Sequence, residues 1–455
     1  MILKSINPYN GKTLKTYKEH SKKEISNKIK ETHEAWLNWK KTDFKERTLL
    51  MHNLSKALKD SKESLAKLMT EEMGKPFQAG IAEVEKCAGV CDFYATHSKD
   101  FLKDQLVETE AKKSYISFQP LGVVLAIMPW NFPLWQVFRF LAPGLMAGNC
   151  GILKHASNVS GCALAIEDLV IAAGFPAHVF QSILISGKKV NPIIENPLIK
   201  AVTLTGSTFA GKMVAQKAAS LIKKSVLELG GSDPYLILED ADLNLAAEIC
   251  VNSRLINSGQ SCISAKRFIV IKTIEKEFIR LFKQKMSKKI MGNPMNDQTA
   301  IGPQAREDLR EELHQQVKKS IKKGAKCILG GVIPKGKGAF YPATILTNVK
   351  KGMPAYDEEL FGPVAAIISA KNEEEAIKIA NDTSFGLGSA VFTKDLIKGE
   401  RIAKQELQAG SAFVNEMVKS DARLPFGGIN QSGYGRELSA FGIHEFVNIK
   451  TVYVK

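Results

Sequence analysis

The sequence lacks any long, uninterrupted apolar stretch. No run approaches the roughly 20 residues that a membrane-spanning helix needs, although 44% of the residues are hydrophobic. The opening segment, Met1–Pro8, has no basic patch followed by an apolar core, as a secretory leader would have. Internal repeats and low-complexity segments are also missing. These absences predict a soluble, cytoplasmic protein with no membrane partner.

Cysteine is scarce, and its spacing shows no pairing. The seven cysteines are scattered, their number is odd, and none belongs to a Cys-x-x-Cys pair typical of metal or redox sites. Cys87 and Cys91 are one helical turn apart, which is more typical of one packed helix face than of a ligand pair. The pattern predicts free thiols in a reducing compartment and no metal site.

Acidic residues are fewer than basic ones. The chain has 47 aspartates and glutamates against 63 lysines and arginines, a formal charge of +16. Such an excess can indicate a nucleic-acid partner, but here the lysines are spread along the whole chain in short clusters. We therefore interpret the charge as a solvated, lysine-rich surface with no nucleic-acid partner, which attracts anionic ligands.

Short apolar runs alternate with helical patterns over most of the chain. With 455 residues, more than one domain is expected. Apolar residues recur at helical spacing between positions 20 and 105. Beyond that region, helical stretches such as 158–173 and 208–222 separate predicted strands at 122–128, 150–153, 179–185, 201–205 and 225–229. This order predicts βαβ units in an open, doubly wound parallel sheet.

A second α/β cycle follows. Its predicted strands lie at 268–272, 341–346, 363–370, 388–393 and 411–415, and its predicted helices at 274–289, 373–381 and 395–406. Residues 106–120 are polar and β-leaning, and the tail from Val447 to Lys455 has the composition of a strand. Because little chain remains to cover it, the terminal strand is expected to pair with another element or another subunit.

One cysteine differs from the others in its surroundings. Cys262 lies among small and polar residues in the segment Asn257–Ser264, where Gly259 and Ser261 leave room for a ligand to approach the sulfur. A glycine-rich turn also lets backbone N–H groups point at a bound oxygen, as acyl chemistry requires. Cys250, in an apolar run, instead has the surroundings of a packing residue. Cys262 is therefore the candidate nucleophile.

Residues 204–213 form a glycine turn between a predicted strand and a predicted helix. The segment nearly matches a P-loop, but that motif needs serine or threonine after the lysine to hold Mg²⁺, and Met213 stands there. We therefore exclude a nucleoside triphosphatase. Gly206, Ser207 and Gly211 at a helix N-terminus are still suited to a pyrophosphate. The alternative is a tight strand-to-helix turn with no ligand.

Other polar residues follow predicted strands, where open α/β sheets place their ligands. Glu228 precedes two glycines and is a candidate general base. Asn131, held between Pro129 and Pro133, is a candidate oxyanion donor through its side-chain amide. Lys154 ends another strand. Each of these residues also has a purely structural interpretation, as a cap, an ion-paired residue or a turn.

Arg139 lies in an otherwise apolar helical stretch. Arginine is almost never fully buried without a partner, so its guanidinium is expected to face an internal carboxylate, a cavity or a bound anion. It follows Asn131 by eight residues, which is about two helical turns. Both side chains can therefore serve one cavity.

Together, these motifs resemble the aldehyde dehydrogenase superfamily over nearly the whole chain. They are Pro-Trp-Asn-Phe-Pro at 129–133, the lysine-led turn at 154–157, Thr-Gly-Ser at 205–207 with Gly211, Glu-Leu-Gly-Gly at 228–231, Gly-Gln-Ser-Cys at 259–262, Glu-Leu-Phe-Gly-Pro at 359–363 and Pro-Phe-Gly-Gly at 425–428. The resemblance implies an α/β fold with a Rossmann-like cofactor domain (1–105 and 121–230), a second α/β catalytic domain (231–430) and a small β oligomerisation element (106–120 and 431–455). It also implies a homodimer or homotetramer.

The resemblance assigns roles to individual residues. Cys262 would be the nucleophile and Glu228 the general base, while Asn131 and the backbone N–H of Cys262 would form the oxyanion hole. No metal is required. A nicotinamide cofactor is implied, with Lys154 and Glu359 at its two riboses. The residues implied to bind this cofactor are Trp130, Lys154, Ser157, Gly206, Ser207, Gly211, Glu359 and Phe361.

Within the superfamily, the chain is most similar to bacterial succinate-semialdehyde dehydrogenases. Arg139 and the closing run at 433–446 carry this likeness, which implies NAD(P)-dependent oxidation of succinate semialdehyde to succinate, with Arg139 and Phe426 in the substrate pocket. The chain also departs from the pattern. Ile256 stands where some relatives have a second substrate-binding arginine, with Arg254 two residues earlier.

A further departure lies before the Pro-Phe-Gly-Gly motif, where Asp421, with Ser420 adjacent, replaces a serine that assists in relatives. The aldehyde is therefore less firmly fixed than the reaction. One alternative is a dehydrogenase of broad specificity for uncharged aldehydes, with Arg139 merely salt-bridged. Another is a catalytically silent binding protein on the same fold, against which the intact Cys262, Glu228 and Asn131 argue.

Ser157 favours NADP⁺ as the cofactor. Many NAD-using relatives carry a glutamate at this position, which accepts hydrogen bonds from the adenine ribose and would repel a 2′-phosphate. Ser157 removes that charge and supplies a hydroxyl donor, and Lys154 brings a positive charge suited to phosphate. Use of both NADP⁺ and NAD⁺ is the alternative, because selection also depends on neighbours such as His155 and Asn158.

Overall fold

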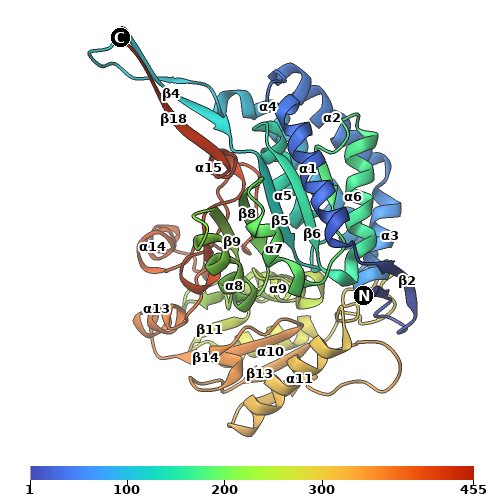
Figure 1. Ribbon diagram of the computed structural model, residues 1–455. Coiled ribbons are helices and arrows are strands. Elements are labelled where there is room, and N and C mark those ends of the chain that lie inside the picture. The colour runs from blue at the N-terminus through green and yellow to red at the C-terminus, as the bar shows by residue number, and fades with distance from the viewer. Residues whose placement is uncertain (1) are drawn as a thin grey trace.

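The computed structural model describes residues 2–455, which form two large, mostly parallel sheets with helices around them (Figure 1). The order of strands in the six-stranded sheet is β17 (Gly433–Tyr434), β9 (Lys224–Glu228), β8 (Ile199–Thr205), β5 (Val123–Met128), β6 (Cys150–His155) and β7 (Phe180–Ser182). Its strands run parallel, except that β17 is antiparallel to β9. The predicted doubly wound parallel sheet is confirmed.

The strands of this sheet are apolar because helices cover them. In β5, five of the six residues of Val-Val-Leu-Ala-Ile-Met are buried, a run typical of a strand between two helical layers. The helices of the first half are α1 (Lys22–Trp39), α2 (Phe44–Asp60), α3 (Lys62–Met73), α4 (Phe77–Phe101), α5 (Trp135–Met146), α6 (Ser160–Ala172), α7 (Asn191–Glu195) and α8 (Thr208–Ala219). The helical prediction for residues 20–105 is therefore confirmed, as four helices.

Local sequence explains where these helices begin. At α1, Ser21 and Glu24 form a capping box, in which the backbone N–H of Ser21 donates to Glu24 and that of Glu24 donates to the Ser21 hydroxyl. Such a box satisfies N–H groups that the first turn leaves without partners. At α8, the side chain of Ser207 accepts from the N–H of Ala210 in the same way.

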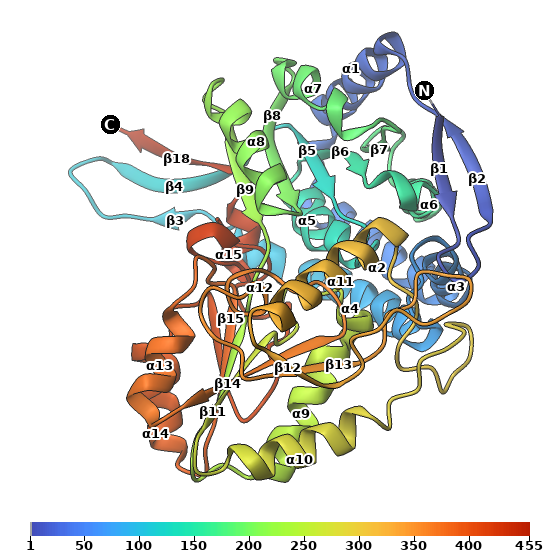
Figure 2. The same ribbon diagram turned by 90° about the horizontal axis from the view of Figure 1, so that it is seen from below.

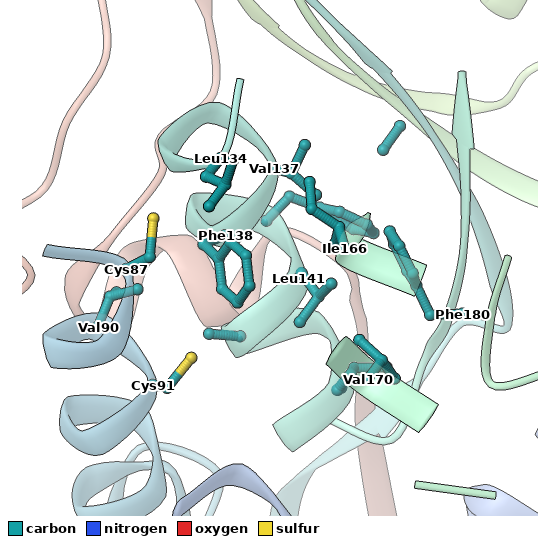
Figure 3. Packing of buried hydrophobic residues seen from close by; sticks show 14 of the residues in the cluster. Cys87, Val90, Cys91, Leu134, Val137, Phe138, Leu141, Ile166, Val170 and Phe180 are labelled. Atoms are coloured by element: carbon teal, nitrogen blue, oxygen red, sulfur yellow. The ribbon is translucent and has the colours of Figure 1, made fainter. Parts of the chain in front are cut away.

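The largest core lies between α4, α5, α6 and the six-stranded sheet (Figure 3). Cys87 and Cys91 of α4 point toward Phe138 and Leu141 of α5, and Ile166 and Val170 of α6 close the other side. Burying an aliphatic or aromatic side chain of this size contributes about 1.5–3 kcal/mol. Cys87 and Cys91 are buried and free, as predicted for one packed helix face. This core supports the strand ends that carry the site.

The second large sheet forms the other half of the molecule. Its order is β12 (Lys326–Leu329), β13 (Thr344–Thr347), β14 (Val364–Ala370), β11 (Arg267–Ile271), β10 (Pro234–Ile237), β15 (Gly388–Phe392) and β16 (Ser411–Val414). Only β12 among these strands is antiparallel to its neighbour. The later helices are α9 (Leu243–Leu255), α10 (Glu275–Met286), α11 (Glu307–Lys322), α12 (Pro354–Asp357), α13 (Glu373–Asn381), α14 (Leu396–Arg401) and α15 (Ser439–His444).

A three-stranded antiparallel sheet projects from the body (Figures 1 and 2). The terminal strand β18 (Val447–Val454) pairs along its whole length with β4 (Lys113–Pro120), whose other edge holds β3 (Gln105–Leu106). The terminal strand thus pairs with another element of its own chain, one of the two expected outcomes. Since β17 lies in the six-stranded sheet, residues 431–455 contribute strands to two different sheets.

Several elements were missed by the sequence prediction. The hairpin of β1 (Ile2–Ile6) and β2 (Thr13–Lys18) has mostly exposed, lysine-rich strands, and β10 is short and opens with proline. The predicted helix 395–406 is helical, but only α14 is α-helical and residues 402–406 form a π-helical turn. No helix within residues 2–455 combines the length and the apolar character needed to span a membrane.

Candidate active site

Two cavities meet at Cys262. The first, with a volume of about 330 Å³, is lined among others by Trp130, Asn131, Gly206, Ser207, Glu359 and Phe361. The second, of about 490 Å³, is lined among others by Lys86, Trp135, Arg139, Ser420 and Phe426. Cys262 and Gln136 line both cavities. The thiol is therefore open to two binding spaces, each built from residues far apart in the sequence.

The chain before Cys262 turns sharply. Asn257, Ser258 and Gly259 are all left-handed, with φ angles of 51°, 58° and 78°. A Cβ on Gly259 would lie 2.2 Å from the carbonyl carbon of Gly362, so glycine is required there. Two adjacent non-glycine residues in this region store strain, which is typical of functional sites. The local sequence therefore presents Cys262 at the end of a constrained turn.

Two buried cations anchor this turn. Lys266 Nζ donates to the carbonyl oxygens of Ser261, at 2.9 Å, and of Cys262. Arg254 Nη2 donates to the carbonyl of Gly259 at 2.6 Å. Arg254 is fully buried and does not line the second cavity, whereas Ile256 does. Arg254 is thus a support for the turn and does not replace the substrate-binding arginine of relatives.

The surroundings of Cys262 favour the thiol over the thiolate. Burial raises its pKa to about 12, while the positive charges of Lys266 and Arg139 act in the opposite direction. Only the thiolate is a strong nucleophile. A neighbouring group must therefore accept the thiol proton when an aldehyde is attacked.

Asn131 packs against the nucleophile turn. Its Nδ2 donates to the carbonyl of Gln260 at 3.1 Å, and Asn257 Nδ2 donates to the carbonyl of Asn131 at 2.6 Å. An amide nitrogen carries two hydrogens, so one remains for a ligand in the first cavity. His155 supports the same loop, because its Nε2 lies 2.8 Å from the carbonyl of Pro133. The position fits an oxyanion donor.

Glu228 ends β9 and is fully enclosed. It lies opposite Thr205 of β8, and neither carboxylate oxygen has a hydrogen-bond partner within residues 2–455. Gly427 makes room for it, since a Cβ there would stand 2.8 Å from Glu228 Oε1. Burial, and next the negative charge of Glu437, raise the pKa of Glu228 well above its usual value. A carboxyl group with a raised pKa is a stronger base than a solvated glutamate. Glu228 lines neither cavity wall.

Arg139 has an internal carboxylate partner. Its Nε lies 2.7 Å from Glu437 Oε2, and its Nη2 donates to the Thr205 hydroxyl at 3.4 Å. The guanidinium carbon is 4.8 Å from the centroid of the Phe426 ring. Arg139 and Phe426 both line the second cavity. Two of the expected surroundings, a carboxylate and a cavity, are therefore present together.

The first cavity brings together most of the residues assigned to a cofactor. The rings of Trp130 and Phe361 meet edge to face, with centroids 5.7 Å apart. Glu359 Oε1 accepts from the N–H of Gly231 at 3.2 Å and lies 3.3 Å from Lys266 Nζ. Gly206 and Ser207 lead into the N-terminus of α8, where free N–H groups favour an anion.

Three assigned residues do not line this cavity. Lys154 is buried at the end of β6, and burial lowers its pKa. Ser157 is half-buried in the short turn that follows. Gly211 lies within α8, where a Cβ would approach the Leu229 side chain to 2.5 Å, so it allows close packing of the helix.

Sequence reasoning missed three residues of the site. Gln136 lines both cavities, and its Oε1 is buried without a partner among residues 2–455. Lys266 joins the nucleophile turn to Glu359. Lys86 reaches the second cavity from α4. Of these, only Lys266 had a signal in the sequence, since it follows Cys262 by four residues and lies just after the polar segment Asn257–Ser264.

The comparisons with known proteins agree with this geometry. The model of the family described as "Aldehyde dehydrogenase family" matches residues 2–452. A protein of Synechocystis named probable succinate-semialdehyde dehydrogenase [NADP(+)] is 46% identical over 454 residues, covering 100% of both chains. The succinate semialdehyde dehydrogenase [NAD(P)+] Sad of Escherichia coli K12 is 44% identical and covers 99% of this chain and 97% of its own.

A solved structure is similar over the same length. Succinic semialdehyde dehydrogenase from Streptococcus pyogenes, crystallised in complex with NADP⁺, superposes with a TM-score of 0.97. It is 35% identical in sequence and covers 99% of each chain. The arrangement of the two large sheets and the small projecting sheet is therefore the same in this chain and in the S. pyogenes enzyme.

Proposed function

The chain belongs to the aldehyde dehydrogenase family, and we propose that it oxidises succinate semialdehyde to succinate with NADP⁺. The observation that carries the proposal is the position of Cys262 where the two cavities meet. An aldehyde bound on one side can then bond to the sulfur, and a hydride acceptor bound on the other side can reach the aldehyde carbon. The relatives in Synechocystis and E. coli, whose names state this substrate, support the choice of aldehyde.

The residues of the first cavity fit a nicotinamide dinucleotide. Ser207 and the N-terminus of α8 suit its phosphates, and Glu359 suits a ribose hydroxyl. A Cβ on Gly230 would stand 2.4 Å from Glu359 Oε2, so glycine is needed for this carboxylate to lie where it does. When bound, NADP⁺ supplies the acceptor for one hydride. Every other step belongs to side chains of this chain.

The chemistry follows from three residues. Glu228, through a water molecule, takes the thiol proton of Cys262 and passes it to solvent. The sulfur adds to the carbonyl carbon of the aldehyde, and Asn131 donates to the oxygen that becomes negative. Loss of the hydride from that carbon leaves a thioester on Cys262. Glu228 then takes a proton from a water molecule, which attacks the thioester and releases the carboxylate product and the thiol. The raised pKa of Glu228 suits it to accept that proton.

The second cavity is suited to an aldehyde with a distal carboxylate. Lys86, Arg139 and Lys289 line it. Glu83, the one acidic residue among residues 2–455 in this lining, is already paired with Lys75, so the potential of the cavity is positive and favours an anionic substrate. The ion pair of Arg139 with Glu437 favours a second candidate function, a dehydrogenase for uncharged aldehydes, in which Arg139 has a structural role.

We further infer an NADP⁺ preference from Ser157, with NAD⁺ as a secondary cofactor. Ser157 leaves the cofactor side of the site without the carboxylate that would repel a 2′-phosphate, and Lys154 is the nearest cation in sequence. The names of the relatives in Synechocystis and E. coli, and the NADP⁺ complex of the S. pyogenes enzyme, support this choice.

We also infer a homodimer or homotetramer in the cytoplasm. The projecting sheet leaves Leu106, Ile449 and Tyr453 exposed, and exposed apolar side chains on an unpaired sheet edge are a typical subunit contact. All seven cysteines are free, as expected in a reducing compartment. Sedimentation of the purified protein would determine the oligomeric state.

Reduction of NADP⁺, followed at 340 nm with a panel of aldehydes, tests the proposal. Succinate semialdehyde should give a higher kcat/KM than butanal, which has the same carbon number and no carboxylate. Cys262→Ala should abolish turnover with both while NADP⁺ binding remains, and Cys327→Ala, at another half-buried free thiol, should retain it. Equal kcat/KM for the two aldehydes would establish the second candidate function.

A further inference from the structure

Lys86 extends from α4 toward the second cavity, where its ammonium contacts Ser420. Its Nζ donates to Ser420 Oγ at 2.8 Å and lies 4.3 Å from the centroid of the Trp135 ring. All three residues line the same cavity as Cys262. Their sequence positions belong to three separate segments, so only the fold brings them together. The result is a cation, a hydroxyl group and an indole on one wall.

The hydrogen bonds of Ser420 leave its proton available. Its Oγ accepts from Lys86 Nζ and also from Trp135 Nε1, at 3.1 Å. A hydroxyl group has two acceptor sites and one donor, so both acceptor sites are used. Within residues 2–455, the structure gives the Ser420 hydroxyl no acceptor for its own proton. An anion in the cavity could therefore accept from Ser420 and Lys86 at the same time.

No carboxylate of residues 2–455 forms an ion pair with Lys86. The other charged groups near it have partners. Glu83 lies 2.8 Å from Lys75, Asp421 lies 2.7 Å from Arg423, and Arg139 is paired with Glu437. No acidic oxygen of residues 2–455 lies within the 4.0 Å of an ion pair with Lys86, so its ammonium is available to pair with a bound anion.

The surroundings already oppose the charge on Lys86. Although Lys86 is an exposed residue, partial desolvation of its ammonium and the nearby positive charge of Arg139 lower the pKa of Lys86 to about 8. A carboxylate arriving beside it would compensate both effects, because opposite charge favours the ionised form. Lys86 and Ser420 can therefore bind an anion that enters the cavity.

We propose that Lys86 is a specificity-determining residue that binds, together with Ser420, the distal carboxylate of the aldehyde substrate. The proposal rests on the proposed function and deepens it. It assigns recognition of the carboxylate to a lysine on α4, in addition to Arg139, whose guanidinium is already shared with Glu437 and Thr205. Trp135 orients the pair, since it donates to Ser420 and lies beneath the ammonium.

Steady-state kinetics of Lys86→Met and Lys86→Arg with succinate semialdehyde and butanal test the assignment. Methionine keeps the length of the stem and removes the charge. Lys86→Met should raise KM for the semialdehyde roughly tenfold or more, as loss of a charged hydrogen bond implies, with a much smaller change in kcat. Its kcat/KM for butanal should change by less than about threefold. Lys86→Arg should recover most of the lost affinity.

Lys419→Met is the matched control. Lys419 lines the same cavity and is exposed like Lys86, but it is already paired with Glu416 at 3.1 Å. It should leave KM for the semialdehyde within about twofold of the original value. A similar effect of both methionine variants would mean that only the overall charge matters, and would overturn the assignment.

The same kinetics distinguish an error in the role of Lys86 from an error in the proposed function. If the unmodified enzyme prefers the semialdehyde and Lys86→Met retains that preference, Lys86 is not the carboxylate-binding residue, while the function stands. If the unmodified enzyme shows no preference, the proposed function itself fails. An equal loss for both aldehydes in Lys86→Met would assign Lys86 a structural role in α4 and overturn the inference.

Discussion

Lys266 Nζ lies 3.3 Å from Glu359 Oε1, and the same ammonium donates to the carbonyl of Ser261 at 2.9 Å. A single buried cation thus joins the turn that carries Cys262 to the carboxylate proposed to hold the cofactor. The Lys266 side chain is 1% exposed, so its charge is compensated almost entirely by these contacts. Movement of Glu359 is therefore coupled to the position of the nucleophile.

Lys266→Met should impair both sides of the site. Without the ammonium, the carbonyls of Ser261 and Cys262 lose a donor and Glu359 loses its counterion. We expect kcat to fall and KM for NADP⁺ to rise, each roughly tenfold. The free energy of unfolding should fall by about 3 kcal/mol. Kinetics and thermal melts measure the three quantities. Lys272→Met is the control, since Lys272 pairs with Glu275 on the surface. A change in stability alone would contradict the coupling.

Glu228→Gln should separate the two halves of the reaction. Glutamine retains the shape of the side chain but does not accept a proton from water. The first turnover should therefore give a rapid burst of NADPH close to one equivalent per site, followed by a steady state slower by roughly 10²–10⁴-fold. Stopped-flow absorbance at 340 nm resolves the two phases. Equal loss of burst and steady state would assign the base to another group.

The sequence predicted the catalytic side of the site better than its supports. Glu228, Asn131 and Cys262 stand at strand ends or turns, and glycines and prolines lie near them in sequence, so local pattern was sufficient to single them out as candidates. Their surroundings depend on distant segments. Glu437, the partner of Arg139, is almost 300 residues away in the chain, and no pattern within one helix reveals such a pair.

The fold shows the same division. Apolar runs such as β5 are buried at nearly every position and were predicted, whereas β1 and β2 are mostly exposed and are stabilised by pairing with each other and by contacts with distant residues such as Leu184. In α11, the few buried residues include Leu313 and Val317 within a highly charged helix, so its hydrophobic signal was too weak to separate from a loop. Strand pairing and sparse helix contacts are tertiary effects that local propensity does not contain.

His155 should make the enzyme less stable in mild acid. Its ring is buried between Pro133 and the backbone of Met128 and Ala156, and burial lowers its pKa to about 4. Since the unfolded chain binds this proton near pH 6.5, the stability contributed by neutral His155 is complete above that pH. It is lost as the pH falls from about 6.5 toward 4, by up to about 3 kcal/mol.

Thermal melts of His155→Asn and the unmodified protein between pH 7 and 5 check this expectation. The variant should be less stable at pH 7, and the difference between the two proteins should shrink as the pH falls. His178→Asn is the control, because His178 is half exposed and lies 3.7 Å from Glu31 at the surface. A difference that stays constant with pH would show that His155 is not the titrating group.

Ser157→Glu should shift cofactor preference from NADP⁺ toward NAD⁺. A carboxylate there repels the 2′-phosphate of NADP⁺ and accepts hydrogen bonds from the ribose hydroxyls of NAD⁺. The ratio of kcat/KM for NADP⁺ to that for NAD⁺ should fall roughly tenfold or more, as a new like-charge contact in a half-buried turn implies. Ser157→Ala removes the hydroxyl donor without adding charge, so it should lower the same ratio only by about threefold. Initial rates with both cofactors at saturating aldehyde measure these ratios. An unmodified enzyme that prefers NAD⁺, with no shift in Ser157→Glu, would show that neighbours such as His155 and Asn158 make the selection instead.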